Sequence, residues 1–73
     1  MIKVNLSEIL KDQKISSKEL TQMIDITEAN LSILRSGKAK AIRFSTLENI
    51  CKALNCQPGD ILAYTEEDED VND

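Results

Sequence analysis

Residues 17–36, SKELTQMIDITEANLSILRS, constrain the fold more than any other stretch of the chain. Leu20 and Ile24 are four residues apart, and Leu31 and Leu34 are three apart, so each pair lies on one face of a short helix. Because the break between the two patterns is short, the two helices must cross steeply and share their apolar faces. The outer face of the second helix is then left uncovered. This spacing predicts a helix-turn-helix, although an ordinary helical hairpin has the same pattern.

The net charge of −4 combines two regions of opposite sign. Six acids lie in residues 66–73, which leaves seven acids against nine bases in residues 1–65, a net charge of about +2. No acid lies between Glu28 and Glu48. The bases that follow the second helical pattern are Arg35, Lys38, Lys40 and Arg43. A basic cluster beside an uncovered helix face favours binding to double-stranded DNA.

Other function classes have little support in the composition. No apolar run approaches the length of about 18 residues that marks a membrane span, and the start MIKVNLSE lacks the apolar block of a signal peptide. We therefore expect a cytoplasmic protein without a membrane partner. The chain has no His and no Gly-rich phosphate loop, so we expect no enzyme activity, cofactor, metal or small-molecule ligand. Cys51 and Cys56 are too few for a disulfide framework, and Cys51 is expected to be buried on a helix.

Capping patterns predict five short helices in a single all-α domain. The expected helices cover residues 6–14, 17–24, 27–36, 45–55 and 57–62. Capping boxes begin at Ser16 and Ser45, and Asn5 and Thr27 are further N-cap residues. Gly37 follows the third helix at the position where a left-handed residue ends a helix.

Three further expectations concern the turn and the two ends of the chain. Asp25 lies where the chain must turn sharply, so we expect it to have a positive φ. The alternation of residues 2–4 fits either a short N-terminal strand or an extended lead-in. The last helix should bury Ile61 and Leu62. Residues 65–73 are acidic and nearly without apolar side chains, so we expect a domain over residues 1–64 followed by a disordered tail.

Three motifs carry a family resemblance. They are KEL at 18–20, ITEANLSILRSGKAKAIRFSTLENICKAL at 26–54 and CQPGDIL at 56–62. They resemble the Cro/phage-repressor type of bacterial DNA-binding domain, the XRE family. The resemblance implies a compact five-helix fold with its helix-turn-helix at the second and third helices. It also implies a small stand-alone transcriptional regulator, of repressor type, that binds DNA sequence-specifically. The family usually has Ala where Thr21 stands and Gly where Asp25 stands.

The candidate base-contacting residues follow from the direction of the third helix. At about 100° per residue, Leu31 and Leu34 point inward and the opposite face points outward. The outward face and the leading end of the helix carry Thr27, Glu28, Ala29, Ser32 and Ile33. Ala29 and Ile33 can touch thymine methyl groups. Glu28 either accepts a hydrogen bond from cytosine or stabilises the helix N-terminus. Family members contact bases from the positions that match all of these residues except Ser32.

The candidate phosphate-contacting residues flank this face. They are Ser17, Asn30, Arg35, Lys38, Lys40, Arg43 and Ser45. The four bases match the backbone-contacting loop of the family, whereas without the resemblance they would fit an ordinary solvated loop. Ser17 and Ser45 lie at helix starts, where backbone N–H groups bind phosphate.

One such helix covers only a few base pairs, so we expect a homodimer that binds two half-sites. Candidate dimer surfaces are the last helix with Tyr64, and residues 2–4 pairing as a strand. The alternative function is a protein-interaction module, such as an antitoxin or an anti-repressor, that uses the acidic tail.

Overall fold

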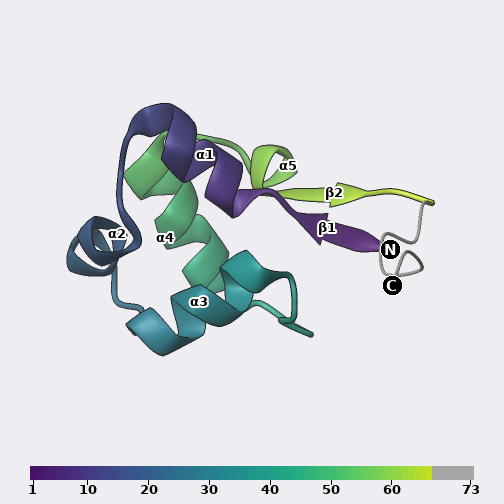
Figure 1. Ribbon diagram of the computed structural model, residues 1–73, viewed down its shortest axis with the longest axis horizontal. Helices are drawn as coiled ribbons and strands as arrows, with labels where there is room; N and C mark the ends of the chain where they lie inside the picture. Colours follow the sequence, from purple (N-terminus) through teal and green to yellow (C-terminus); the bar gives the residue numbers. More distant parts are fainter. Residues whose placement is uncertain (67–73) are drawn as a thin grey trace.

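The computed structural model describes residues 1–66, which form a helical body with a two-stranded β-ribbon projecting from it (Figure 1). The elements in chain order are β1 (Ile2–Val4), α1 (Leu6–Gln13), α2 (Ser17–Met23), α3 (Glu28–Ser36), α4 (Phe44–Leu54), α5 (Pro58–Ile61) and β2 (Leu62–Tyr64). The five expected helices are confirmed, and α2 and α3 form the helix-turn-helix. No helix of the described residues is long and apolar enough to cross a membrane.

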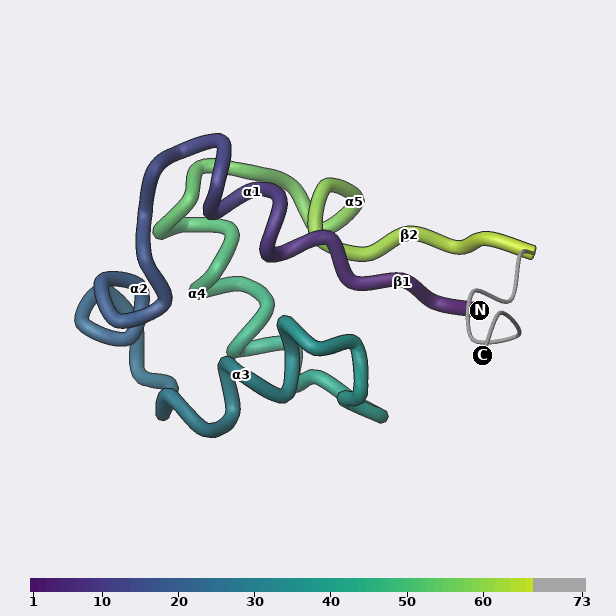
Figure 2. The backbone as a smooth tube through the Cα atoms, viewed as in Figure 1, coloured from purple at the N-terminus to yellow at the C-terminus, as the bar shows by residue number. Residues whose placement is uncertain are grey.

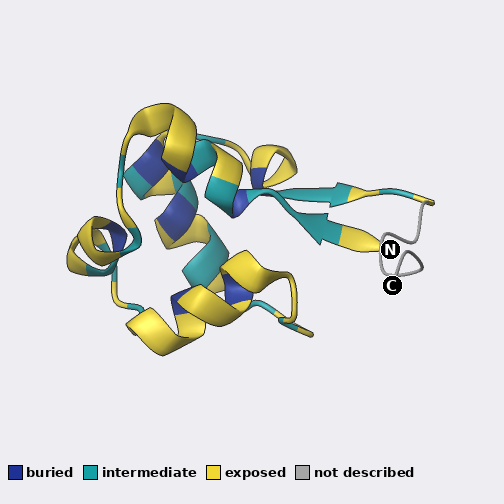
Figure 3. Ribbon diagram, viewed as in Figure 1, coloured by how far each residue is buried: buried dark blue, intermediate teal, exposed yellow. Residues whose placement is uncertain are grey.

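Every helix contributes to a core of aliphatic side chains (Figure 3). Its buried members are Leu6, Leu10, Leu20, Leu31, Leu34, Ile50, Leu54 and Ile61. Burying one such side chain completely stabilises the fold by about 1.5–3 kcal/mol. This core therefore fixes the angle between α2 and α3, which in turn decides which side of α3 remains exposed.

Local hydrogen bonds begin α2 and α3 where the sequence predicts. At the start of α2, Ser16 Oγ accepts from Glu19 N at 3.0 Å, and Ser16 N donates to Glu19 Oε1 at 2.8 Å. The hydrogen bond from the Ser16 backbone, and then that from its side chain, lower the pKa of Glu19. At the start of α3, Thr27 Oγ1 accepts from Asn30 N at 3.1 Å. Gly37 ends α3 with a φ of 79°, as expected.

The turn between α2 and α3 differs from the prediction. Among the described residues, positive φ occurs at Lys14, Gly37 and Asn55, so the expectation for Asp25 is wrong. Ile24 instead takes an extended conformation, and Ile26 N donates to Ile24 O at 3.0 Å. The direction of the chain thus changes through an extended residue and a three-residue turn. This explains how Asp25 can stand where the family has Gly without a left-handed backbone.

Two predicted caps are also wrong. Helix α4 begins at Phe44 rather than at Ser45, and its N-cap residue, Arg43, makes no side-chain capping hydrogen bond. Asn5 precedes α1 without capping it through its side chain. Its backbone N instead donates to Ile61 O at 2.7 Å, which ties the start of α1 to the end of α5.

A short antiparallel sheet joins the two ends of the domain. Ile2 is opposite Tyr64 and Val4 is opposite Leu62, so the short N-terminal strand is confirmed. Leu62 is correspondingly a partly buried strand residue and not the end of the last helix. Thr65 N donates to Met1 O at 2.9 Å, so pairing passes the expected domain boundary by one residue. Residues 67–73, most of the expected disordered tail, lie outside the described residues.

Candidate nucleic-acid interface

Helix α3 presents one face to the core and the opposite face to solvent. Leu31 is fully buried and Leu34 is 7% exposed, which fixes the rotation of the helix about its axis. On the other side Ile33 is 47% exposed. The predicted base-contacting residues are all exposed: Thr27, Glu28, Ala29, Ser32 and Ile33. They lie together along the outer side and the leading end of one helix, which is the arrangement that major-groove recognition requires.

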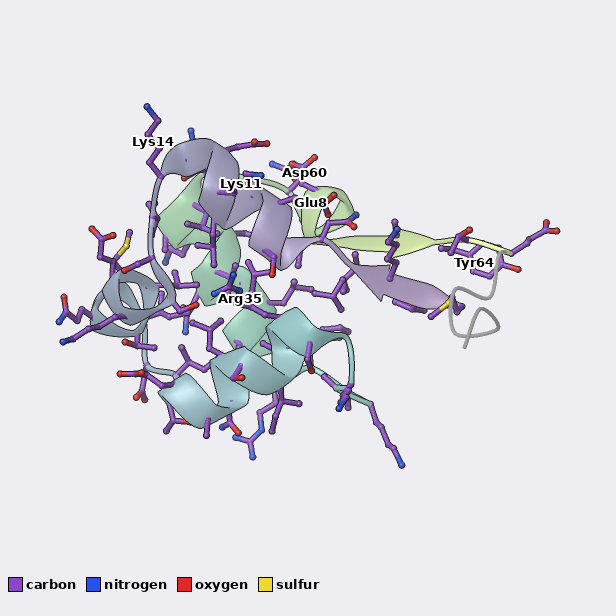
Figure 4. All side chains as sticks on the ribbon, in the orientation of Figure 1. Glu8, Lys11, Lys14, Arg35, Asp60 and Tyr64 are labelled. Carbon is purple, nitrogen blue, oxygen red and sulfur yellow. The ribbon has the colours of Figure 1, made fainter. Side chains whose placement is uncertain are left out.

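On one flank of this face, Arg35 joins α3 to the starts of α1 and α2. Its Nε donates to Ser7 Oγ at 3.0 Å, and its Nη1 donates to Ser17 Oγ. Figure 4 shows the Arg35 side chain extending from α3 toward α1. Arg35 and Ser17, both predicted to contact phosphate, are thus brought together. The guanidinium carries five N–H donors, so it can bind a phosphate oxygen while these two bonds hold its direction.

On the other flank, α3 faces the start of α4. Asn30 and Arg43 line one shallow hollow together with Thr27 and Thr46. Because Arg43, the N-cap residue, does not cap α4 through its side chain, the N–H groups of the first turn can donate to a bound anion. Such N–H groups at a helix start bind phosphate oxygens well. Ser45 is exposed in this same turn, so it keeps its predicted position beside a phosphate although it is not a cap.

The loop over residues 37–43 adds two more cations beside α3. Ser36 Oγ donates to Ile33 O at 2.8 Å and accepts from Lys38 N at 3.3 Å, which directs the chain as it leaves the helix. Lys38 and Lys40 are exposed. Figure 2 shows that this loop lies on the same side of the molecule as the β-ribbon. The predicted phosphate contacts therefore come from both flanks of α3 and from its trailing end.

Two residues of this surface were not among the sequence predictions. Ser7 accepts from Arg35 across 28 residues of sequence, and Thr46 lines the hollow with Arg43. Thr46 could have been found, because it lies in the first turn after a basic loop. Ser7 could not, because its position depends on how α1 packs against α3.

The two cysteines lie at the end of α4, away from α3. Cys51 is half-buried rather than buried, and Cys56 N donates to Cys51 O at 3.0 Å. Burial, and then the neighbouring Cys51, raise the pKa of the Cys56 thiol. A raised pKa leaves less thiolate at neutral pH, so Cys56 is a weak nucleophile and metal ligand. Within residues 1–66, no group of three His, Cys, Asp or Glu side chains is arranged to hold a metal ion.

Comparison with known proteins gives matches to the same class of domain. The family model described as the Cro/C1-type HTH DNA-binding domain matches residues 5–67. The chain is also 61% identical over 66 residues to the uncharacterized HTH-type transcriptional regulator YozG of Bacillus subtilis (strain 168). That alignment covers 90% of this chain and 79% of the relative. The matched span includes α2, α3, the basic loop and α4, so it contains the whole surface described above.

Proposed function

The chain belongs to the Cro/C1-type helix-turn-helix family of DNA-binding domains, and from that premise we propose that it regulates transcription through the outer face of α3. In this proposal α3 enters the major groove of double-stranded DNA and binds a specific sequence. The base contacts come from Thr27, Glu28, Ala29, Ser32 and Ile33. The name of the Bacillus relative, a transcriptional regulator, supports regulation as the consequence of binding.

One observation carries the proposal: the exposed face of α3 lies between two flanks that suit phosphate. Arg35 with Ser17 forms one flank, and Arg43 with the uncapped start of α4 forms the other. A helix in the major groove lies between two phosphate backbones, so cationic and N–H donors on both sides match the groove. Contacts to phosphate fix the position of the helix, and the side chains between them distinguish bases.

Most of the proposed base-contacting side chains are small or apolar. Ala29 and Ile33 suit thymine methyl groups, and Ser32 can donate to or accept from a base edge. Thr27 Oγ1 already accepts from Asn30 N, and the O–H of Thr27 can still donate to a base or phosphate. Glu28 shares a hollow with Arg35, which adds a cation beside the carboxylate whether it contacts cytosine or stabilises the helix start.

The phosphate contacts predict a change in the salt dependence of binding. Replacing Arg43 or Lys40 with alanine should lower the slope of log K against log salt by about one unit each. Each change should also weaken binding to all duplexes by a similar factor, because phosphates carry no base identity. Fluorescence-anisotropy titrations at four or more salt concentrations measure both quantities.

Lys11→Ala is the matched control for these variants. Lys11 is also an exposed cation, but it lies on α1, away from α3 (Figure 4). Its replacement should leave the slope unchanged. An equal change in slope for Lys11 and Arg43 would mean that binding depends on the net charge alone, and it would contradict the proposed surface.

We propose in addition that the protein acts as a homodimer. A single recognition helix contacts few base pairs, and two copies bind half-sites that are about one helical turn apart. The β-ribbon supplies exposed apolar side chains for such a contact, with Ile2 62% and Tyr64 71% exposed. Because β1 already pairs with β2, only the outer edges and faces of the ribbon are open to a second copy.

The dimer proposal predicts a change in association at one side chain. Tyr64→Lys should weaken self-association by about tenfold or more, because buried tyrosines are frequent anchors of interfaces. Sedimentation equilibrium over a range of protein concentrations measures this. Met23→Lys removes an apolar side chain that is 50% exposed on α2, away from the ribbon, and should leave association unchanged. A monomeric wild type, or loss of the dimer in the Met23 variant alone, would exclude the ribbon as the interface.

The family match favours DNA binding over the alternative of a protein-interaction module such as an antitoxin. The proposal includes no enzymatic step, and it assigns the protein to the cytoplasm because its DNA target is there.

A further inference from the structure

The basic loop over residues 37–43 lies beside the β-ribbon, and the second strand of this ribbon leads to the end of the described chain. Tyr64 is opposite Ile2 in the ribbon, and Thr65 N donates to Met1 O at 2.9 Å. Ile2 in turn lines an apolar pocket of about 230 Å³ together with Lys40 and Ala41 of the loop. The chain that follows Thr65 therefore starts from a ribbon that contacts the loop, on the same side of the molecule (Figure 1).

The sequence after this point is complementary in charge to the loop. Five consecutive acids begin at Glu66, and Asp73 is a sixth. The loop region has no acid of its own between Glu28 and Glu48, and Lys38, Lys40 and Arg43 are all exposed. Eight residues in extended form span up to about 29 Å, whereas the molecule measures 35 × 24 × 22 Å. The acidic segment is long enough to reach the loop and the trailing end of α3.

The segment resembles DNA in its density of negative charge. Five of its acids are consecutive, and duplex DNA has one negative charge about every 1.7 Å of helix axis. Carboxylates of the segment can therefore pair with the same cations that would otherwise bind phosphates.

We propose that residues 66–73 bind the basic loop of their own chain and compete with DNA for it. The proposal rests on the proposed function only in treating the loop as part of the DNA surface. A short tether gives the segment a local concentration of the order of millimolar, so even a weak contact is occupied much of the time. The contact lowers the apparent affinity for any duplex by the fraction of time the loop is covered. The same factor applies to specific and non-specific duplexes, because the competing contact is made in the free protein.

The first test needs no DNA. Amide resonances of residues 38–43 are compared by NMR between the wild type and a variant in which the six acids of residues 66–73 are replaced by their amides. We expect shift differences at low salt that are centred on the loop and vanish in about 0.5 M salt, where screening extends only a few ångströms. Identical loop shifts would overturn the proposal. Shifts that grow with protein concentration would also overturn it, because the segment would then bind a second copy.

The second test separates local competition from net charge. Glu66→Gln with Glu67→Gln is compared with Glu8→Gln and Asp12→Asn, which change the net charge equally. Glu8 and Asp12 line a hollow that also includes Asp60, and Figure 4 shows Glu8 and Asp60 on the side of α1 and α5, away from α3. Non-specific duplex binding is measured by anisotropy at about 50 mM salt, where electrostatic contacts are strong.

We expect the six-amide variant to bind about tenfold more tightly than the wild type, by relief of competition for the phosphate-binding surface. The Glu66 and Glu67 pair should strengthen binding several times more than the Glu8 and Asp12 pair. Equal effects of the two pairs would overturn the proposal in favour of general charge repulsion. If no variant binds DNA while the loop shifts are present, the proposed function fails and the internal contact stands.

Discussion

Replacing Leu31 with alanine should lower the free energy of unfolding by about 2–5 kcal/mol, the cost of truncating a fully buried leucine. Leu31 has no exposed surface and belongs to the same core as Leu20 and Leu34. A chain of 73 residues is expected to have a total stability of about 4–11 kcal/mol. The variant should therefore have a much lower midpoint in urea, with an unchanged slope, when unfolding is followed by circular dichroism.

Ile33→Ala is the matched control for this prediction, because it shortens a side chain two residues away in the same helix. Ile33 is 47% exposed and points away from the core, so its unfolding free energy should change by less than about 0.5 kcal/mol. Similar losses of stability in the two variants would mean that α3 is rotated differently about its axis, and the assignment of its outer face would be wrong.

Replacing Ile33 with glutamate should weaken specific DNA binding by about 100-fold, which corresponds to about 2.7 kcal/mol. The change removes an apolar contact with a base edge, and the loss of a matched base contact in a specific site typically costs about 1–3 kcal/mol. It also adds a carboxylate where α3 lies between two phosphate backbones. Glutamate is a good helix former, so the fold should be retained. Anisotropy titration against a selected specific duplex measures the loss.

Ile33→Val is the conservative companion to this variant and keeps a methyl contact, so it should lose much less affinity. The two variants should unfold at the same urea concentration. Undiminished binding by the glutamate variant would show that the outer face of α3 lies outside the DNA interface.

The parts of the fold that depend on neighbouring residues could be predicted from the sequence. The capping box of Ser16 with Glu19 and the cap of Thr27 on Asn30 are local hydrogen bonds that the residue types specify. Gly37 likewise ends α3 because glycine adopts a positive φ at little cost.

The errors occurred where distant packing decides the local structure. Ser45 matched a capping pattern, yet α4 begins one residue earlier, at Phe44, with Arg43 as its N-cap residue. Asp25 avoids a positive φ because Ile24 takes the extended conformation instead. Strand β2 was missed because three residues are too few for a sequence pattern, and they become a strand only by pairing with β1.

The candidate site likewise has one part that the sequence predicts and another that depends on distant packing. Helical periodicity was enough to find the exposed face of α3. The two buried leucines determine in which direction every other side chain of the helix points. The contact of Arg35 with Ser7 and Ser17 joins three helices and has no signal in a single sequence. It matters because it explains how one flank of the face is held in position.

The most direct measurement of the central claim is a selection from a randomised duplex pool, at two salt concentrations, with the wild type and the Arg43→Ala and Ile33→Glu variants. The bound duplexes are sequenced, and binding is titrated by anisotropy. We predict that the wild type enriches one sequence, and that Arg43→Ala enriches the same sequence with weaker, less salt-dependent binding. Ile33→Glu should lose the enrichment while it keeps residual binding at low salt. A folded wild type that binds no duplex at low salt, or an Ile33→Glu variant that enriches the wild-type sequence, would contradict the account.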